Sequence, residues 1–176
     1  MLGRFVGIDI GAETIKVVEL SGEGTSVVWT HKEIVEHHKE PTTALLEILA
    51  RLGWSNITGA AVSGRFSRQL KLSRVPTKQA QAEGFRHLFG NDSGTVVSIG
   101  SHGFSVLELR ESGLEVFREN SRCSQGTGNF LRQLVERFDL GIEEASALCH
   151  GVEKPAPLSG RCPVILKTDM THLANK

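Results

Sequence analysis

The residues best suited to chemistry lie around Cys123. Residues 122–131 read RCSQGTGNFL, with glycines on both sides of Thr127 just ahead of an amphipathic helix. The first turn of a helix offers unpaired N–H groups and a partial positive charge, so anions bind there and a nearby cysteine is held as the thiolate. The segment therefore indicates either a metal-binding cysteine or an inert, partly buried thiol beside a helix capped by Thr127.

Cys162, in the segment SGRCP, is the second candidate metal ligand. A [4Fe–4S] cluster takes four thiolates, which two chains related by a two-fold axis could supply as two cysteines each. A zinc site made from Cys123, Cys149, His150 and Cys162 is the competing interpretation, because zinc favours Cys and His ligands. Cys149 is otherwise expected to pack on the apolar face of its helix.

A glycine turn near the N-terminus is a candidate phosphate site. Asp9, Gly11 and Thr14 lie between two strand-like segments, and Lys16 follows. A tight glycine turn exposes backbone N–H groups that cradle phosphate oxygens, and Asp9 could hold Mg²⁺ through water. The alternative is a plain β-turn with a solvated Glu13 and Lys16.

Hydrophobic periodicity predicts the elements that position these residues. Strands are expected at residues 5–10, 14–20, 25–35, 57–62, 95–100, 104–109 and 114–117, and helices at 41–52, 77–89, 126–138, 142–149 and 168–174. The order is α/β with a weak internal repeat, because a strand, a glycine turn and a returning strand occur twice. Two lobes with a hinge at residues 91–94, or one continuous sheet, both fit this pattern.

Composition excludes several classes of protein. The 176 residues carry 20 basic and 20 acidic side chains, without the basic excess typical of nucleic-acid binders. No apolar run approaches the length of a membrane span, and the N-terminus lacks a secretory pattern, so a cytoplasmic location is expected. Three cysteines do not suggest a disulfide framework.

Two further segments are rich in charged residues, and both are expected to be solvated. The pair His37-His38 lies in a charged stretch that is expected to be a solvated loop rather than a metal site. A basic run is expected to be a solvated face that could approach an acidic partner or a CoA-bearing protein; its members are Arg65, Arg68, Lys71 and Arg74.

The chain resembles the activator (component A) ATPases of 2-hydroxyacyl-CoA dehydratases and benzoyl-CoA reductases. The resemblance covers essentially the whole chain and lies in residues 7–16 (GIDIGAETIK), 62–65 (VSGR) and above all 123–131 (CSQGTGNFL). The Cys-x-x-Gly-Thr-Gly-x-Phe pattern is specific, whereas the first hairpin is shared by the actin, sugar-kinase and heat-shock-chaperone superfamily. Cys162 stands where the family's second cluster cysteine is expected.

This resemblance implies an actin-like (ribonuclease H-like) α/β fold, with a first lobe at residues 1–92 and an incomplete second lobe at 93–176. It implies a homodimer in which Cys123 and Cys162 of each chain hold one [4Fe–4S] cluster, with ATP and Mg²⁺ bound between the lobes. The activity implied is delivery of a low-potential electron to a dehydratase or reductase partner. The phosphate loops would contain Asp9, Gly11, Ala12, Glu13, Thr14 and Lys16, and then Gly100 and Ser101.

The sequence departs from the family pattern at three places. The second phosphate loop usually reads Asp-Ile-Gly-Gly-Gln-Asp, but residues 98–103 read SIGSHG, without either acid. Residues 163–169 are less acidic than in compact activators, and the chain ends at Lys176. These departures favour the first module, or a fragment, of a long activase-related protein. They also keep open a catalytically degenerate assembly or regulatory module; a sugar or acyl kinase would need a catalytic carboxylate for which there is no candidate.

Overall fold

The computed structural model describes residues 3–24, 26–120, 126–158 and 162–175. The chain forms two compact units. One comprises Met1–Val96 with Val106–Arg118, and the other Val97–Ser105 with Glu119–Lys176. The lobe boundary between residues 92 and 93 stays a prediction.

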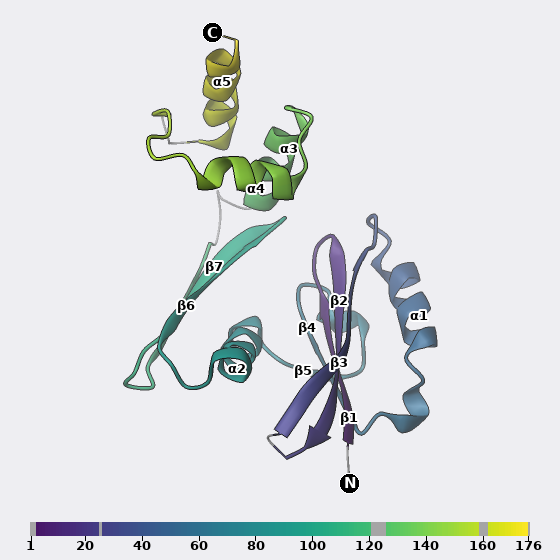
Figure 1. Ribbon diagram of the computed structural model, residues 1–176. Coiled ribbons are helices and arrows are strands. Elements are labelled where there is room, and N and C mark those ends of the chain that lie inside the picture. Colours follow the sequence, from purple (N-terminus) through teal and green to yellow (C-terminus); the bar gives the residue numbers. More distant parts are fainter. Residues whose placement is uncertain (1–2, 25, 121–125, 159–161, 176) are drawn as a thin grey trace. The chain divides into compact units, whose positions relative to one another are not determined.

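A five-stranded sheet forms the centre of the first unit (Figure 1). Its strands are β1 (Gly3–Ile10), β2 (Thr14–Glu23), β3 (Ser26–Glu36), β4 (Gly59–Ser63) and β5 (Ser73–Arg74). The spatial order is β3-β2-β1-β4-β5. The pairs β1–β2 and β2–β3 are antiparallel, whereas β1–β4 and β4–β5 are parallel. This arrangement brings the ends of β1 and β4 side by side.

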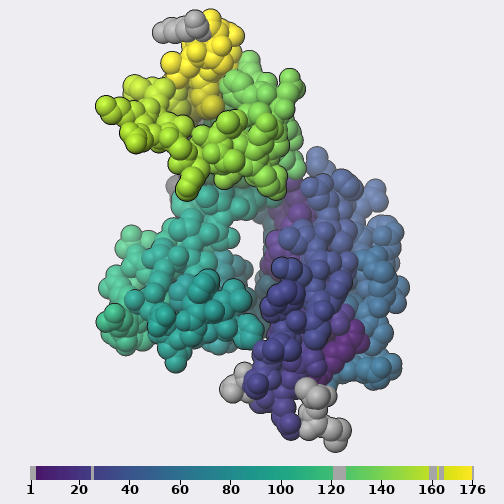
Figure 2. Space-filling view, viewed as in Figure 1, coloured from purple at the N-terminus to yellow at the C-terminus, as the bar shows by residue number. Residues whose placement is uncertain are grey.

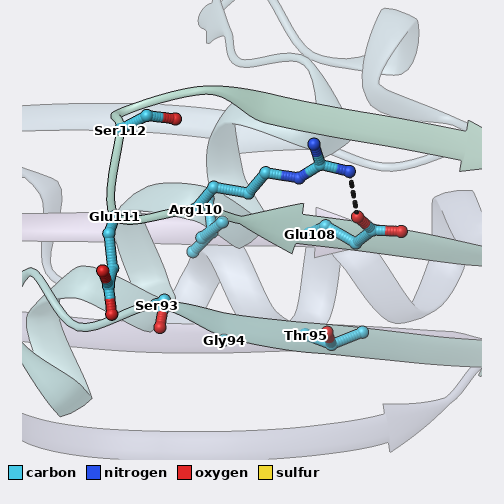
Figure 3. Close-up of a pocket in the computed structure, with 8 residues that line it drawn as sticks. Ser93, Gly94, Thr95, Glu108, Arg110, Glu111 and Ser112 are labelled. Atoms are coloured by element: carbon cyan, nitrogen blue, oxygen red, sulfur yellow. Dashed lines mark hydrogen bonds and ion pairs between the residues drawn. The ribbon is translucent and has the colours of Figure 1, made fainter.

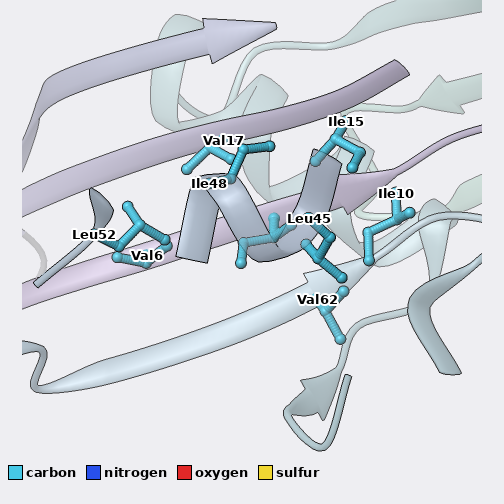
Figure 4. Close-up of a cluster of buried hydrophobic side chains, with 9 residues drawn as sticks. Val6, Ile10, Ile15, Val17, Leu45, Ile48, Leu52 and Val62 are labelled. Carbon is cyan, nitrogen blue, oxygen red and sulfur yellow. The ribbon is translucent and has the colours of Figure 1, made fainter. Parts of the chain in front are cut away.

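Helix α1 (Pro41–Arg51) supplies the other half of the main core. Pro41 occupies its first turn, where a missing N–H costs nothing. Alternate residues of a strand share one face, and the apolar residues of β1 and β2 follow that period. In Figure 4 they converge on α1, and in Figure 2 β1–β3 and α1 form one closely packed body in purple to blue. The cluster contains Val6, Ile8, Ile10, Ile15, Val17, Leu45, Ile48, Leu52 and Val62.

Helix α2 (Thr77–Phe89) packs its Ala82 against a second, smaller core that includes Leu107 and Leu109. These leucines belong to a three-stranded sheet. Its strands are β6 (Gly94–Gly100), β7 (Gly103–Leu109) and β8 (Glu115–Glu119), in that order. The seven longer strands predicted from the sequence are therefore present, and β5 was missed because it has only two residues.

Glu115 on β8 links the small sheet to α2. It accepts a hydrogen bond from Arg86 and lies 3.0 Å from the Lys78 ammonium group. The hydrogen bond from Arg86 is the main cause that lowers the pKa of Glu115 below its ordinary value of 4.5, and Lys78 adds to it.

A pH dependence of stability follows from this carboxylate. Because the folded-state pKa is lowered, the contribution of Glu115 is present above its unfolded pKa and is lost as pH falls through the folded pKa. We expect Glu115→Gln to lower the thermal midpoint at neutral pH, and the gap to wild type to shrink below pH 4.5. Thermal melts across this range measure it; a pH-independent gap would contradict the assignment.

The second unit contains α3 (Thr127–Glu136), α4 (Ile142–His150) and α5 (Pro163–Ala174). Helix α5 begins five residues before the predicted start at residue 168, because proline is favourable in the first turn. Thr127 is not the cap of α3. Gly126 takes that place, with a left-handed φ of 96° and no side-chain capping bond. Within the described ranges, no helix is long and apolar enough to cross a membrane.

Candidate phosphate loops and cysteine site

The first glycine turn, residues 11–13, joins β1 to β2. The Gly11 N–H donates to the Thr14 carbonyl at 2.9 Å, which closes the turn. Asp9 and Lys16 are opposite each other in the antiparallel register, and the Lys16 Nζ lies 3.1 Å from Asp9 Oδ2. The structure therefore brings together the residues predicted for the first phosphate loop.

The end of β4 completes the surroundings of Asp9. Ser63 is opposite Asp9 in the parallel register, and its hydroxyl donates to Asp9 Oδ1 at 2.9 Å. Gly64 follows with φ 91°, and the Phe66 N–H donates to the Ile10 carbonyl at 3.0 Å. Both oxygens of the Asp9 carboxylate are thus held, while its side chain keeps 37% of its surface exposed.

His37 is buried against the first glycine turn, so the expectation of a solvated loop was wrong for this residue. Its exposed fraction is 3%, whereas His38 is exposed as expected. The cause is the register of β2 and β3, which pairs Thr14 with Glu36 and so places His37 beside the turn. Sequence alone did not fix this register.

His37 contacts the backbone of the first glycine turn at two points. Its backbone N–H donates to the Glu13 carbonyl at 3.0 Å, and its Nε2 lies 3.4 Å from the Gly11 carbonyl. A carbonyl only accepts, so Nε2 is the donor in this contact. Nδ1 is buried and finds no partner in the part of the chain that the structure describes. The ring meets Phe66 edge-on, with centroids 6.3 Å apart.

Substitution of His37 tests this role. His37→Phe keeps an aromatic ring beside Phe66 but removes the hydrogen bond, and we expect a loss of about 1 kcal/mol in the free energy of unfolding. His37→Ala also leaves a cavity, and we expect a loss of about 3 kcal/mol. Denaturant unfolding measures both; no loss in His37→Phe would show that packing alone explains the residue, and equal losses in the two variants would show that the hydrogen bond alone does.

The second glycine turn, residues 100–103, joins β6 to β7 and lies against the start of α3. A Cβ placed on Gly128 would be 2.5 Å from the Gly100 carbonyl oxygen and 3.0 Å from the Ser101 nitrogen. Only glycine allows this approach. The predicted Gly100 and Ser101 therefore lie at the N-terminal end of a ten-residue helix, where N–H groups and the helix dipole favour anions.

A hollow of about 230 Å³ opens beside this turn. Glu119 is among its lining residues, and Asn120 Oδ1 accepts from the Phe104 N–H at 2.6 Å. Asn120 Nδ2 is buried without a partner among the described residues. The sequence comparison considered only Ser98 and Gly103, the positions of the family's two acids, and missed Glu119. The signal that could have revealed this carboxylate is its position at the end of β8.

The predictions for the three cysteines have different outcomes. Cys162 is half-buried at the N-cap of α5, a twelve-residue helix. Cys149 is exposed in the last turn of α4, so its predicted packing on an apolar face was wrong. Cys123 lies outside the described residues. No three His, Cys, Asp or Glu side chains gather as a metal site within the ranges that are described.

A larger hollow, in the first unit, is lined by none of the predicted site residues. It lies at the ends of β6 and β7, and Figure 3 shows an ion pair of 2.9 Å between Arg110 and Glu108 at its edge. Glu111, Thr95 and two serines are the other polar side chains labelled there. Its size alone does not make it a functional site.

Two curated proteins resemble the chain over 97% of its length at 24% identity. They are a component of the benzoyl-CoA reductase of Thauera aromatica and the activator of lactoyl-CoA dehydratase of Anaerotignum propionicum. The chain spans 63% of the first protein and 68% of the second. No family model matches it.

Two solved structures have the same fold. Component A of the Acidaminococcus fermentans (R)-2-hydroxyglutaryl-CoA dehydratase superposes with a TM-score of 0.79 at 20% identity, over 98% of this chain and 69% of that one. The Clostridium difficile activator of 2-hydroxyisocaproyl-CoA dehydratase, with bound ADPNP, gives 0.77 at 23% identity, over 99% and 66%. In sequence the chain is similar to a benzoyl-CoA reductase subunit and to the activator of lactoyl-CoA dehydratase, and it shares the actin-like fold of component A and of the activator of two 2-hydroxyacyl-CoA dehydratases.

Proposed function

We propose that this chain is a module of an ATP-dependent iron–sulfur activator that delivers a low-potential electron to a 2-hydroxyacyl-CoA dehydratase or benzoyl-CoA reductase type partner. The observation that carries the proposal is the similarity along 97% of the chain to a reductase component and a dehydratase activator. A homodimer and a cytoplasmic location belong to the same proposal.

The residues at the first glycine turn fit the phosphates and Mg²⁺ of ATP. The Asp9 carboxylate is oriented by Ser63 and Lys16 and stays partly exposed, as water-mediated binding of Mg²⁺ requires. Ala12 and Glu13 form the turn itself, and Lys16 adds a positive charge beside it. ATP, when bound, supplies the free energy for a conformational change between the two lobes.

The second glycine turn fits another part of the same phosphate chain. Gly100 and Ser101 lie against the N-terminal turn of α3, which attracts negative charge. Ser101, His102 and Asn120 offer hydrogen-bonding groups beside this turn without adding negative charge. Glu119 is the carboxylate that lines the neighbouring hollow, where the family pattern has two acids in the loop itself.

The donor at Cys162 fits an iron–sulfur cluster. Its sulfur is half-buried at the start of α5, and cysteine sulfur is the ligand that iron–sulfur clusters take from proteins. A [4Fe–4S] cluster, when bound, supplies the one-electron chemistry. Cys123 would be the second ligand, and two chains would share the cluster.

A catalytically degenerate module with an assembly or regulatory role, which binds nucleotide weakly or not at all, is the second candidate. Ser98 and Gly103 replace the two acids of the family's second loop, so fewer carboxylates are available to position Mg²⁺ and water. Hydrolysis separates the candidates: the activator turns over ATP, whereas the degenerate module does not.

Calorimetric titration of the chain with ATP, with and without Mg²⁺, tests the nucleotide half of the proposal. We expect Mg²⁺ to strengthen ATP binding, and Asp9→Asn to remove most of that gain because it removes the charge that attracts the ion. Glu47→Gln, an exposed carboxylate on α1, is the matched control and should bind as wild type does. A folded wild-type chain that binds no ATP would refute this half.

A further inference from the structure

The charges of this chain are strongly segregated along the sequence. The whole chain is balanced at 20 basic and 20 acidic residues, yet residues 48–82 contain no acidic residue at all. The six basic residues of that stretch are Arg51, Arg65, Arg68, Lys71, Arg74 and Lys78. A local excess of this size creates a positive field despite the zero net charge.

Internal ion pairs neutralise two of these six cations. Arg51 pairs with Glu33 at 3.1 Å, and Lys78 pairs with Glu115 at 3.0 Å. The other four are exposed and form no ion pair with any residue that the structure describes; they are Arg65, Arg68, Lys71 and Arg74. Their positive charge is therefore free to act on another molecule.

Packing against the core fixes the segment that carries Arg68, Lys71 and Arg74. Phe66, Leu70 and Leu72 lie between the cations in the sequence and pack against the main core. The Val75 N–H donates to the Val62 carbonyl at 2.9 Å, which ties the far end of the segment to β4. Because these three apolar side chains pack inward, the segment is held against the core while its basic side chains are exposed.

This surface is also hollowed and lies at a sheet edge. Arg68, Leu70, Lys71, Leu72 and Arg74 line a hollow of about 520 Å³, here called the basic hollow. Arg74 belongs to β5, the edge strand of the five-stranded sheet. An edge strand exposes unpaired backbone groups to a neighbouring molecule.

We propose that the basic hollow is a docking surface for an acidic face of a partner protein. Two arginines and a lysine around two leucines match the arginine-rich, partly apolar composition of protein interfaces. A nucleic acid is disfavoured because the chain as a whole lacks the basic excess that drives phosphate-backbone binding. The inference depends on neither ATP nor a cluster, and so it stands apart from the proposed function.

Docking of this kind has a defined electrostatic signature. Exposed opposite charges attract over about 10 Å at moderate salt, so the association should be fast and should weaken steeply as salt rises. Reversal of two cations changes each attraction into a repulsion. We expect such a double reversal to weaken binding by at least about tenfold.

Fluorescence anisotropy with a labelled short polyglutamate peptide tests the proposal on the whole chain. We expect salt-sensitive binding to wild type and its loss in Arg68→Glu/Arg74→Glu. The matched control, Arg118→Glu/Arg137→Glu, makes the same change in net charge at exposed positions outside the hollow and should bind as wild type does. Circular dichroism checks that both variants are folded.

Three results would overturn the proposal. The first is no binding of the peptide to folded wild type at low salt. The second is equal loss in the two double variants, which would reflect net charge alone. The third is tighter binding of duplex DNA or of phosphatidylserine vesicles than of the peptide, which would assign the hollow to a different class of partner.

Discussion

Gly64→Ala is expected to destabilise the protein by about 3 kcal/mol and to disrupt the first glycine turn. An added Cβ would lie 2.5 Å from the Ile10 carbonyl oxygen and 2.7 Å from Asp9 Oδ1. The φ of 91° adds strain for any residue with a side chain. The clash is with backbone and with the carboxylate proposed to bind Mg²⁺, so ATP affinity should fall together with stability.

Gly90→Ala is the matched control for Gly64→Ala. Gly90 has a similar left-handed φ of 76°, but a Cβ there would meet nothing within 4 Å. Its ψ of −152° lies in a region nearly restricted to glycine, so its cost should be strain alone, about 2 kcal/mol, with ATP affinity unchanged. Chemical denaturation and nucleotide titration measure both variants; equal losses in stability would contradict the close approach at Asp9.

Gly128→Ala should destabilise the protein by about 2 kcal/mol, although alanine is the better helix former. Gly128 lies in the first turn of α3, where its Cβ would press on the Gly100 carbonyl oxygen at 2.5 Å. The helix must then move away from the second glycine turn. We expect nucleotide affinity to fall at least about tenfold, because the helix N-terminus no longer faces that turn.

Gly84→Ala is the matched control for Gly128→Ala, because it changes helix propensity without a close contact. Gly84 lies inside α2 with nothing within 4 Å of an added Cβ, so alanine should stabilise the protein by about 0.5–1 kcal/mol. Gly84→Ala should thus stabilise the protein, whereas Gly128→Ala, also within a helix, should destabilise it. Stabilisation by both would show that α3 does not press on the second turn.

The fold could be predicted from sequence where local periodicity decides the structure. The short apolar run of β1 indicated a buried strand, the glycine turn and the next strand indicated a hairpin, and Pro41 marked the start of α1. The antiparallel hairpin in turn fixed the position of Asp9 opposite Lys16. The actin-like fold was predicted correctly from the resemblance of a few motifs, and the superposed activator structures confirm it.

The features that sequence did not reveal depend on pairing between distant segments. His37 is buried because the β2–β3 register places it beneath the first turn. Ser63 reaches Asp9 because β4 pairs with β1 across more than fifty residues. The exposure of Cys149 depends on which side of α4 the neighbouring helices cover, and the short amphipathic pattern did not specify that side.

Anaerobic reconstitution with iron and sulfide tests the central claim, an iron–sulfur activator, most directly. Iron content and absorbance per chain are measured for wild type, Cys123→Ala, Cys162→Ala and the control Cys149→Ala. We predict about four irons per two chains, lost in the first two variants and kept in Cys149→Ala. A folded wild-type chain that takes up no cluster, or a cluster that survives both Cys123→Ala and Cys162→Ala, would contradict the account.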